Sequence, residues 1–125
     1  MSLVQISDHQ PDHYQDAHLE VYFRHRIAKL DSQVLELTRK EYDLLAVLVQ
    51  NAGEIVHRDT LLERVWGYSN EIRTRTLDVH IRRLRKKLGA YAEQYIETIF
   101  SVGYRFQPYR APRRITPPPA MAVTA

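Results

Sequence analysis

The segment that most constrains the fold is residues 75–88, RTLDVHIRRLRKKL. Its aliphatic side chains recur at positions 77, 81, 84 and 88, which is the spacing of one face of an α-helix. Such a stripe is stable only when other elements bury it. Val79 lies about 160° around the helix from the centre of the stripe, among arginines. The pattern predicts a helix with one buried face and one basic outward face that contains a single branched apolar side chain.

Basic residues are concentrated in this part of the chain. Residues 71–88 contain seven arginines and lysines and two acidic residues, whereas the rest of the chain contains 11 basic and 13 acidic residues. The excess of positive charge therefore lies in one short segment, and the rest of the chain is slightly negative. A local stripe of positive charge favours a polyanionic partner.

The composition argues against several other classes of protein. The 125 residues suffice for one domain with a real core, but not for two ordinary domains. No apolar run reaches the roughly 18 residues that span a membrane. The chain has no cysteine for disulfides or thiolate sites, and only four glycines for cofactor loops. We find no zinc-protease motif and no nucleophile–base pair, so we expect a cytoplasmic protein that is not an enzyme, with no cofactor or metal and no membrane contact.

Short strands and two helices are expected before the basic helix. Residues 19–23 alternate as a half-buried strand, and 25–30 and 34–37 continue a small antiparallel meander. TRKE at 38–41 is a capping box, which begins a helix that NAGE at 51–54 ends. Residues 55 and 56 are expected as a very short strand, followed by a second helix at about 58–66.

A loop, GYSNEIRT, leads into the basic helix at about 72–88, and Gly89 marks its end. Residues 95–106, YIETIFSVGYRF, indicate a β-hairpin. We expect residues 1–17 to form a tail or linker and 107–125, which hold five of the six prolines, to form a disordered tail. Residues 18–106 are then one α+β domain with an N-terminal antiparallel sheet, three helices and a C-terminal hairpin. This order is that of the winged helix-turn-helix.

The outward face of the basic helix carries the two kinds of group that DNA recognition needs. Arginine, lysine and hydroxyl side chains contact phosphates, while bidentate donors and apolar contacts with the thymine methyl group read bases. A valine among guanidinium groups suits the thymine methyl group. Asp78 lies off this face, within reach of Arg82, and is expected to be structural. The outward residues are Arg75, Thr76, Val79, His80, Arg82, Arg83 and Lys86.

Other interpretations stay open at this point. A basic stripe is often only a solvated face, and one exposed valine needs no special reason. The basic helix of a protein-interaction module would instead dock on an acidic partner. Structured RNA fits less well because its major groove is deep and narrow, and an anionic membrane fits less well because the apolar stripe is spaced for a core. Trp66, Thr98 and Tyr104 are expected mainly to pack, with polar atoms able to touch a phosphate.

Four stretches, LTRKEYDLL, LLERVWG, RTLDVHIRRLRKKL and VGYRF, resemble the effector domain of OmpR/PhoB-type response regulators. The resemblance covers residues 37–106. It implies a four-stranded N-terminal sheet, three helices and a wing that together bind promoter DNA, as the output domain of a two-component system. It also implies head-to-tail dimers on direct repeats of double-stranded DNA.

The resemblance implies roles for individual residues. The leading base readers would be Val79 and Arg83, with His80 in either role. The phosphate contacts would be Arg75, Thr76, Arg82, Arg85, Lys86, Trp66, Thr98 and Tyr104. The loop that relatives use to contact RNA polymerase would be Tyr68, Ser69, Asn70 and Glu71.

Two features depart from that family. Many relatives carry Arg-Gly at the tip of the wing, where this chain has Phe100 and Ser101. The arginine that commonly enters the minor groove is therefore missing, and Phe100 would instead pack or contact a neighbour. The receiver domain has no counterpart among these residues, which fits either an effector domain separated from its receiver or a regulator that lacks one.

Overall fold

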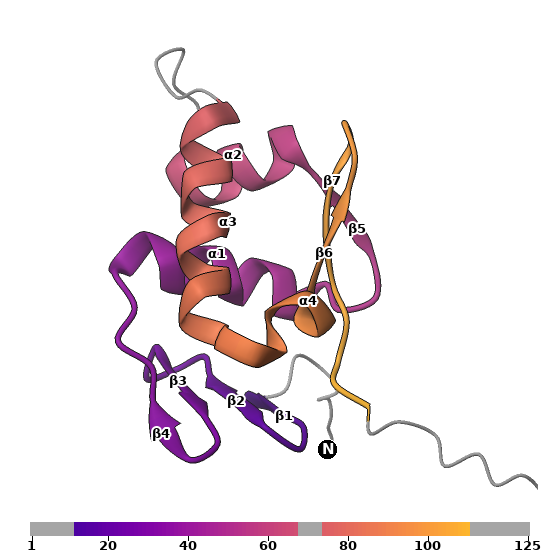
Figure 1. Ribbon diagram of the computed structural model, residues 1–125. Coiled ribbons are helices and arrows are strands. Elements are labelled where there is room, and N and C mark those ends of the chain that lie inside the picture. Colours follow the sequence, from indigo (N-terminus) through magenta and orange to yellow (C-terminus); the bar gives the residue numbers. More distant parts are fainter. Residues whose placement is uncertain (1–11, 68–73, 111–125) are drawn as a thin grey trace, which may run out of the picture.

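The computed structural model describes residues 12–67 and 74–110. The chain forms two antiparallel sheets, one from its N-terminal strands and one that includes its C-terminal hairpin, together with three main helices (Figure 1). The predicted α+β architecture, with an N-terminal sheet, three helices and a hairpin, is confirmed. Within the described ranges, no helix combines the length and the apolar character needed to cross a membrane.

The N-terminal sheet has four strands in the order β1-β2-β3-β4. Its strands are β1 His13–Gln15, β2 Leu19–Tyr22, β3 Ile27–Leu30 and β4 Gln33–Val34. The expectation that residues 1–17 form a tail is wrong for β1, which pairs with β2 so that Tyr14 lies opposite Val21. Three residues carry too short a pattern to be recognised without their partner strand. The domain therefore begins before residue 18.

The helices begin and end close to the predicted positions. Helix α1, Arg39–Gln50, follows the N-cap Thr38, and the predicted capping box with Glu41 is present. Helix α2 is Arg58–Trp66, and helix α3 is Thr74–Leu88. The chain after Gly89 was expected to leave the helix for the hairpin. It forms instead a 3₁₀ turn, η2 Gly89–Tyr91, and a short helix, α4 Ala92–Tyr95.

The second sheet joins the hairpin to the segment before α2. Its strands are β5 Ile55–His57, β6 Ile96–Ile99 and β7 Gly103–Phe106, in the order β5-β7-β6. Gly103 makes the pairing of β5 with β7 possible, because a Cβ atom there would lie 2.0 Å from the carbonyl oxygen of Val56. The hairpin, called the wing below (residues 96–106), is therefore the outer part of a sheet rather than an isolated pair of strands.

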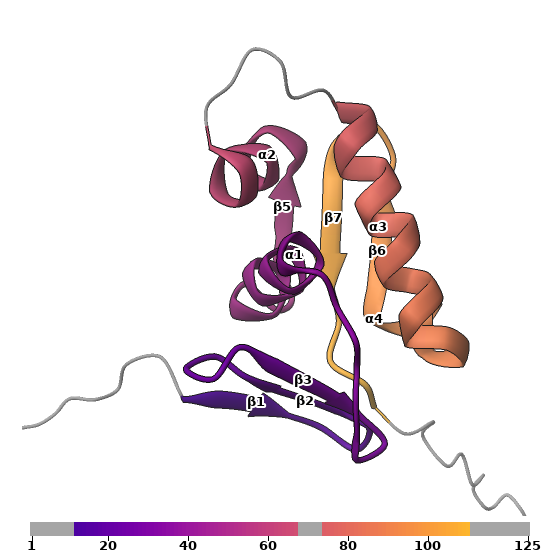
Figure 2. The ribbon, with the colours of Figure 1, turned by 90° about the vertical axis from the view of Figure 1, so that its left-hand side faces the viewer.

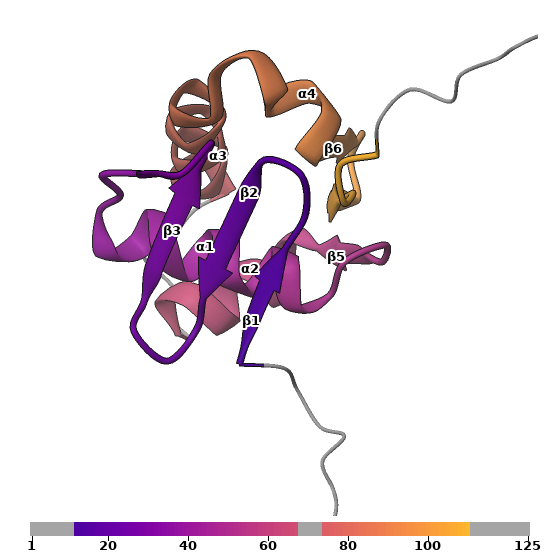
Figure 3. The ribbon, with the colours of Figure 1, turned by 90° about the horizontal axis from the view of Figure 1, so that it is seen from below.

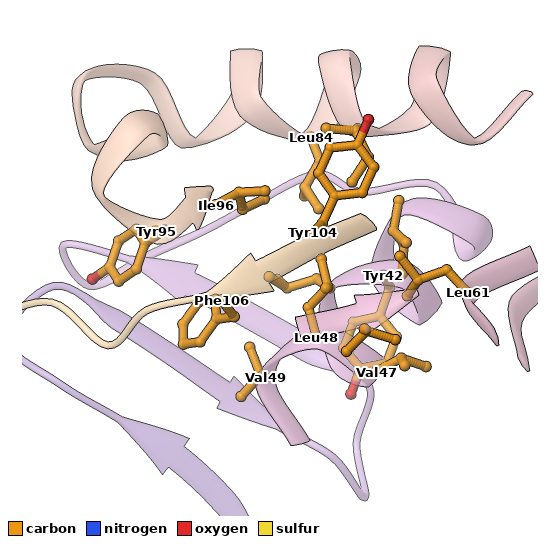
Figure 4. Packing of buried hydrophobic residues seen from close by; sticks show 14 of the residues in the cluster. Tyr42, Val47, Leu48, Val49, Leu61, Leu84, Tyr95, Ile96, Tyr104 and Phe106 are labelled. Carbon is orange, nitrogen blue, oxygen red and sulfur yellow. The ribbon is translucent and has the colours of Figure 1, made fainter. Parts of the chain in front are cut away.

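The core lies where α1, α3 and the wing meet. Leu48 of α1, Leu61 of α2, Leu84 of α3 and Phe106 of β7 are all fully buried (Figure 4). The predicted stripe of α3 is confirmed, since its four aliphatic side chains are at most 1% exposed. Each such side chain stabilises the fold by roughly 1.5–3 kcal/mol. The N-terminal sheet packs beneath α1 (Figure 2).

A carboxylate, Asp16, ties the N-terminal sheet to the C-terminal end of the domain. It accepts hydrogen bonds from the hydroxyl of Tyr95 (2.6 Å) and from the backbone N–H of Tyr109 (3.1 Å). The ring of Tyr109 also packs edge-on against His18. The expectation of a disordered tail from residue 107 is therefore wrong for residues 107–110. Figure 3 shows this side of the molecule, where the turn between β1 and β2 lies toward α4.

Candidate nucleic-acid interface

The face of α3 opposite the buried stripe is strongly positive. Arg75, Arg82, Arg83 and Lys86 are exposed there. Val79 lies among them but is partly rather than fully exposed. No acidic residue interrupts this set, which we call the outward stripe (Arg75, Val79, Arg82, Arg83 and Lys86). The outward stripe therefore offers four cations and one branched apolar side chain on a single helix face.

One flank of α3 is attached to α2 and to the wing through Asp78. The carboxylate of Asp78 accepts two hydrogen bonds of 2.8 Å from Nη2 of Arg58 and one of 2.7 Å from the hydroxyl of Tyr104. Burial alone would raise the pKa of Asp78, but these bonds outweigh burial and hold that pKa below its usual value. Asp78 is thus a structural anion, as predicted, although it bonds to Arg58 and Tyr104 and not to the expected Arg82.

Arg85 faces the wing from the same flank. Its Nη2 donates to the carbonyl oxygen of Ile96 (2.9 Å) and to the hydroxyl of Thr98 (2.7 Å). Its guanidinium carbon lies 5.7 Å from the centre of the Tyr104 ring, which is within cation–π range. Helix α3 and the wing are therefore joined at two places along the helix, by Asp78 and by Arg85.

The opposite flank of α3 faces α1 and α2. The ring of His80 lies 4.9 Å from the ring of Trp66 in an edge arrangement, and its Nδ1 lies 2.8 Å from the carbonyl oxygen of Thr76. Lower on the helix, Nζ of Lys87 donates to the buried carboxylate of Glu41 (2.6 Å). Both flanks are therefore occupied by neighbours, and the outward stripe is the part of α3 left facing solvent.

These contacts separate the residues predicted to touch phosphates into those whose donor hydrogens remain available and those whose donors are used within the domain. Thr98 is exposed, and its hydroxyl accepts from Arg85, so its hydrogen stays available to a phosphate. Tyr104 is 5% exposed, and its one donor hydrogen is directed at Asp78. Figure 4 shows the hydroxyl of Tyr104 on the side of its ring that faces α3. A phosphate contact from Tyr104 would cost that bond, and one from the Nη2 of Arg85 would cost bonds to the wing. The predicted polymerase-contact residues, Tyr68, Ser69, Asn70 and Glu71, lie outside the described residues.

Sequence reasoning missed one residue of this region and left the surroundings of another open. Arg58 holds Asp78 from 20 positions away, a distance at which no local pattern signals a pair. Phe100 was noticed only as a departure from a family pattern, whereas the structure places it at the tip of the wing with 87% of its surface exposed.

A family model and several known proteins match this chain. The model described as "Transcriptional regulatory protein, C terminal" matches residues 32–106. The uncharacterized transcriptional regulatory protein YclJ of Bacillus subtilis is 51% identical over 73 residues, which cover 58% of this chain and 32% of that protein. The response regulator ArlR of Staphylococcus epidermidis is 49% identical over 71 residues, covering 56% and 32%. The chain thus spans about a third of the length of these curated relatives.

Solved structures share the fold. The DNA-binding domain of RstA from Klebsiella pneumoniae, solved in complex with the RstA box, matches with a TM-score of 0.70 and 32% identity, covering 79% of this chain and 100% of that chain. The response regulator DrrB of Thermotoga maritima, an OmpR/PhoB homolog, matches with a TM-score of 0.70 and 32% identity, covering 77% and 44%.

Proposed function

We propose that this chain, which belongs to the family described as "Transcriptional regulatory protein, C terminal", binds promoter DNA in a sequence-specific manner. The resemblance to OmpR/PhoB-type regulators inferred from four sequence motifs is confirmed by that match and by the DrrB structure. In our proposal the chain is the output domain of a two-component regulator, with α3 in the major groove of a double helix and the wing beside it. The observation that carries the proposal is the outward stripe of α3.

The outward stripe supports a division of labour between bases and phosphates. Arg83 and Val79, near the middle of the face, are assigned to bases: a guanidinium donates bidentately to guanine, and the valine meets a thymine methyl group. Arg75, Arg82 and Lys86 are assigned to the phosphates that border the groove. Thr76 and His80, on the flank beside Trp66, contact the backbone or the edge of the site.

Three side chains of the predicted phosphate set, Arg85, Tyr104 and Trp66, support the site by holding its parts in place. Asp78 and Arg85 already hold Tyr104 and Thr98 of the wing by hydrogen bonds. We assign Arg85 and Tyr104 a positioning role, in which they fix the wing relative to α3. Thr98, which is exposed, contacts a phosphate from the wing, and Trp66 supports His80 from α2.

The proposal extends to assembly on the promoter. Two copies bind head to tail on direct repeats, residues 68–71 contact RNA polymerase, and the protein acts in the cytoplasm. These parts rest on the behaviour that the OmpR/PhoB resemblance implies.

Selection of bound duplexes from a random library tests the base assignments. The wild-type domain should enrich a defined motif that contains thymine. Arg83→Ala and Val79→Ala should each relax the preference at one position, at a cost of roughly 1–3 kcal/mol or less. Arg82→Ala should weaken binding to all sequences alike. If Arg82→Ala changed the motif while Arg83→Ala left it intact, the assignment of base and phosphate contacts would be wrong.

A further inference from the structure

The tip of the wing is uncharged and presents one large aromatic ring. Phe100 is 87% exposed, and residues 98–104 contain no charged side chain. The nearest charges along the wing, Glu97 and Arg105, bond to each other at 2.9 Å. A contact made with DNA by the side chain at position 100 is therefore apolar, whereas the hydroxyl of Thr98 remains the polar contact assigned to the wing.

The backbone around Phe100 is held in a defined conformation. The N–H of Val102 donates to the carbonyl oxygen of Ile99 (2.9 Å), which closes a β-turn with Phe100 and Ser101 at its centre. Ser101 adopts a left-handed conformation with φ of 66°. The N–H of Arg58 at the start of α2 donates to the carbonyl oxygen of Val102 (3.0 Å). The turn is thus braced from outside the wing, so the backbone that carries the ring needs little ordering on binding.

The tip lies at the same end of the molecule as the beginning of α3 (Figures 1 and 2). The N-terminal part of a recognition helix is the part that contacts base edges. Because Asp78 and Arg85 join α3 to the wing, the tip keeps a fixed position relative to that part of the helix. A duplex bound along the outward stripe therefore brings its adjacent groove toward Phe100.

We propose that Phe100 is an apolar wedge that enters the minor groove beside the segment read by α3 and partly unstacks one base step. The inference rests on the proposed function. Phenylalanine is among the side chains that act in this way in minor-groove proteins, and they kink the duplex toward the major groove. Pyrimidine–purine steps unstack most easily, so this contact selects such a step by its deformability.

The surroundings of the ring favour DNA over a second protein. Among the described residues, the other exposed large hydrophobic side chains are Ile27, Val34 and Ile55, which lie on β3, β4 and β5. Phe100 is therefore a single projecting ring and not part of an apolar patch. A stable protein interface buries roughly 800 Å² on each partner, whereas a wedge needs only one side chain.

The test uses a duplex carrying the motif selected by the wild-type domain, with 2-aminopurine at each step that flanks it in turn. Wild-type binding should raise the fluorescence at one step, because unstacking relieves quenching. Phe100→Ala should abolish the rise, weaken binding by about tenfold and lose the preference for a pyrimidine–purine step. Val34→Ala, which shortens another exposed side chain far from the wing, should change none of these.

A charged tip provides the complementary variant. Phe100→Arg should regain affinity through a phosphate or groove contact, with a salt dependence of log K steeper by about 0.9. It should not restore the fluorescence rise. Circular dichroism of both variants should match the wild type, because the ring is exposed.

The possible failures can be told apart. If Phe100→Ala kept the affinity, the flanking preference and the fluorescence rise, the wedge would be ruled out while DNA binding stood. If the variant lost only cooperativity on a duplex with two sites, the ring would contact a second copy and the inference would be overturned. If the wild-type domain selected no duplex at all, the proposed function would fail and the inference with it.

Discussion

The hydroxyl of Tyr104 on the wing donates a 2.7 Å hydrogen bond to the carboxylate of Asp78 on α3. The same carboxylate accepts two bonds from Arg58 at the start of α2. One anion thereby joins three elements that are far apart in the sequence. Because the proposed reading of DNA depends on the wing and α3 keeping one relative orientation, this contact has consequences for both stability and binding.

Tyr104→Phe keeps the buried ring and removes the bond to Asp78. We expect the free energy of unfolding to fall by about 1 kcal/mol, because Asp78 keeps its bonds to Arg58 and has some access to water. DNA binding should weaken alike for all sequences, since no base contact is lost. Urea unfolding and fluorescence anisotropy measure the two effects. Tyr22→Phe is the matched control, because the hydroxyl of Tyr22 donates to Glu20 on its own strand and, within residues 12–67 and 74–110, links no second element. Unchanged values for Tyr104→Phe itself would refute the linking role of Asp78.

The Asp16 carboxylate should make the free energy of unfolding fall as the pH is lowered. Burial acts to raise the pKa of Asp16, but bonds from the N–H groups of Leu19 and His18 and from two tyrosine hydroxyls outweigh it, so the pKa lies below its usual value. Such a group contributes stability that is present above its unfolded pKa of about 4 and is lost as pH falls through the folded pKa. Asp16→Asn should therefore be destabilised by about 1–3 kcal/mol at pH 7. The difference in the free energy of unfolding between the wild type and Asp16→Asn, measured by urea unfolding, should shrink as the pH is lowered to 2. A difference that does not change with pH would contradict the stabilising role of the Asp16 carboxylate.

Gly103→Ala should disrupt the pairing of the wing with β5. The added Cβ atom would lie 2.0 Å from the carbonyl oxygen of Val56. This oxygen belongs to the backbone of β5, so the clash can be relieved only by moving the strands apart. We expect a loss of about 2 kcal/mol or more in the free energy of unfolding. Thermal unfolding measures it, and an unchanged melting temperature would mean that the two strands separate more readily than the structure implies.

Ser101→Gly should stabilise the domain. Ser101 has φ of 66°, a conformation that costs a residue with a Cβ atom about 1 kcal/mol or more and costs glycine little. Part of this gain is offset by the greater freedom of glycine in the unfolded chain, so we expect a net gain of about 0.5 kcal/mol. Ala at the same position keeps the Cβ atom and serves as the control, which should show no gain.

Local patterns predicted much of the fold. The period of the aliphatic residues predicted the buried stripe of α3, and TRKE predicted the capping box that begins α1. Both signals are contained in one segment and depend on no distant partner. Strand β1 and helix α4 gave no such signal, because three or four residues are too few to show a period. Contacts with distant residues hold these short elements in place, such as the bond from Tyr95 of α4 to Asp16.

The candidate site was predictable only in part, for the same reason. Helical geometry placed Arg83 and Lys86 outward, where the structure has them. It also placed Val79 outward, although the structure leaves this side chain partly covered. Geometry along one helix could not reveal that Arg85 bonds to Thr98 or that Asp78 bonds to Arg58, because these partners come from other elements. The division between DNA contacts and positioning contacts therefore required the tertiary structure.

The central claim is that the outward stripe of α3 binds DNA, and a salt series measures it most directly. The affinity of the wild-type domain for its selected duplex, followed by fluorescence anisotropy, should give log K that falls linearly with log salt, by about 0.9 per phosphate contact. Arg82→Ala should reduce the slope by about one such unit, while Arg24→Ala, an exposed arginine at the β2–β3 turn, should leave it unchanged. A flat salt response of the wild-type domain, or an equal effect of the two substitutions, would contradict the claim.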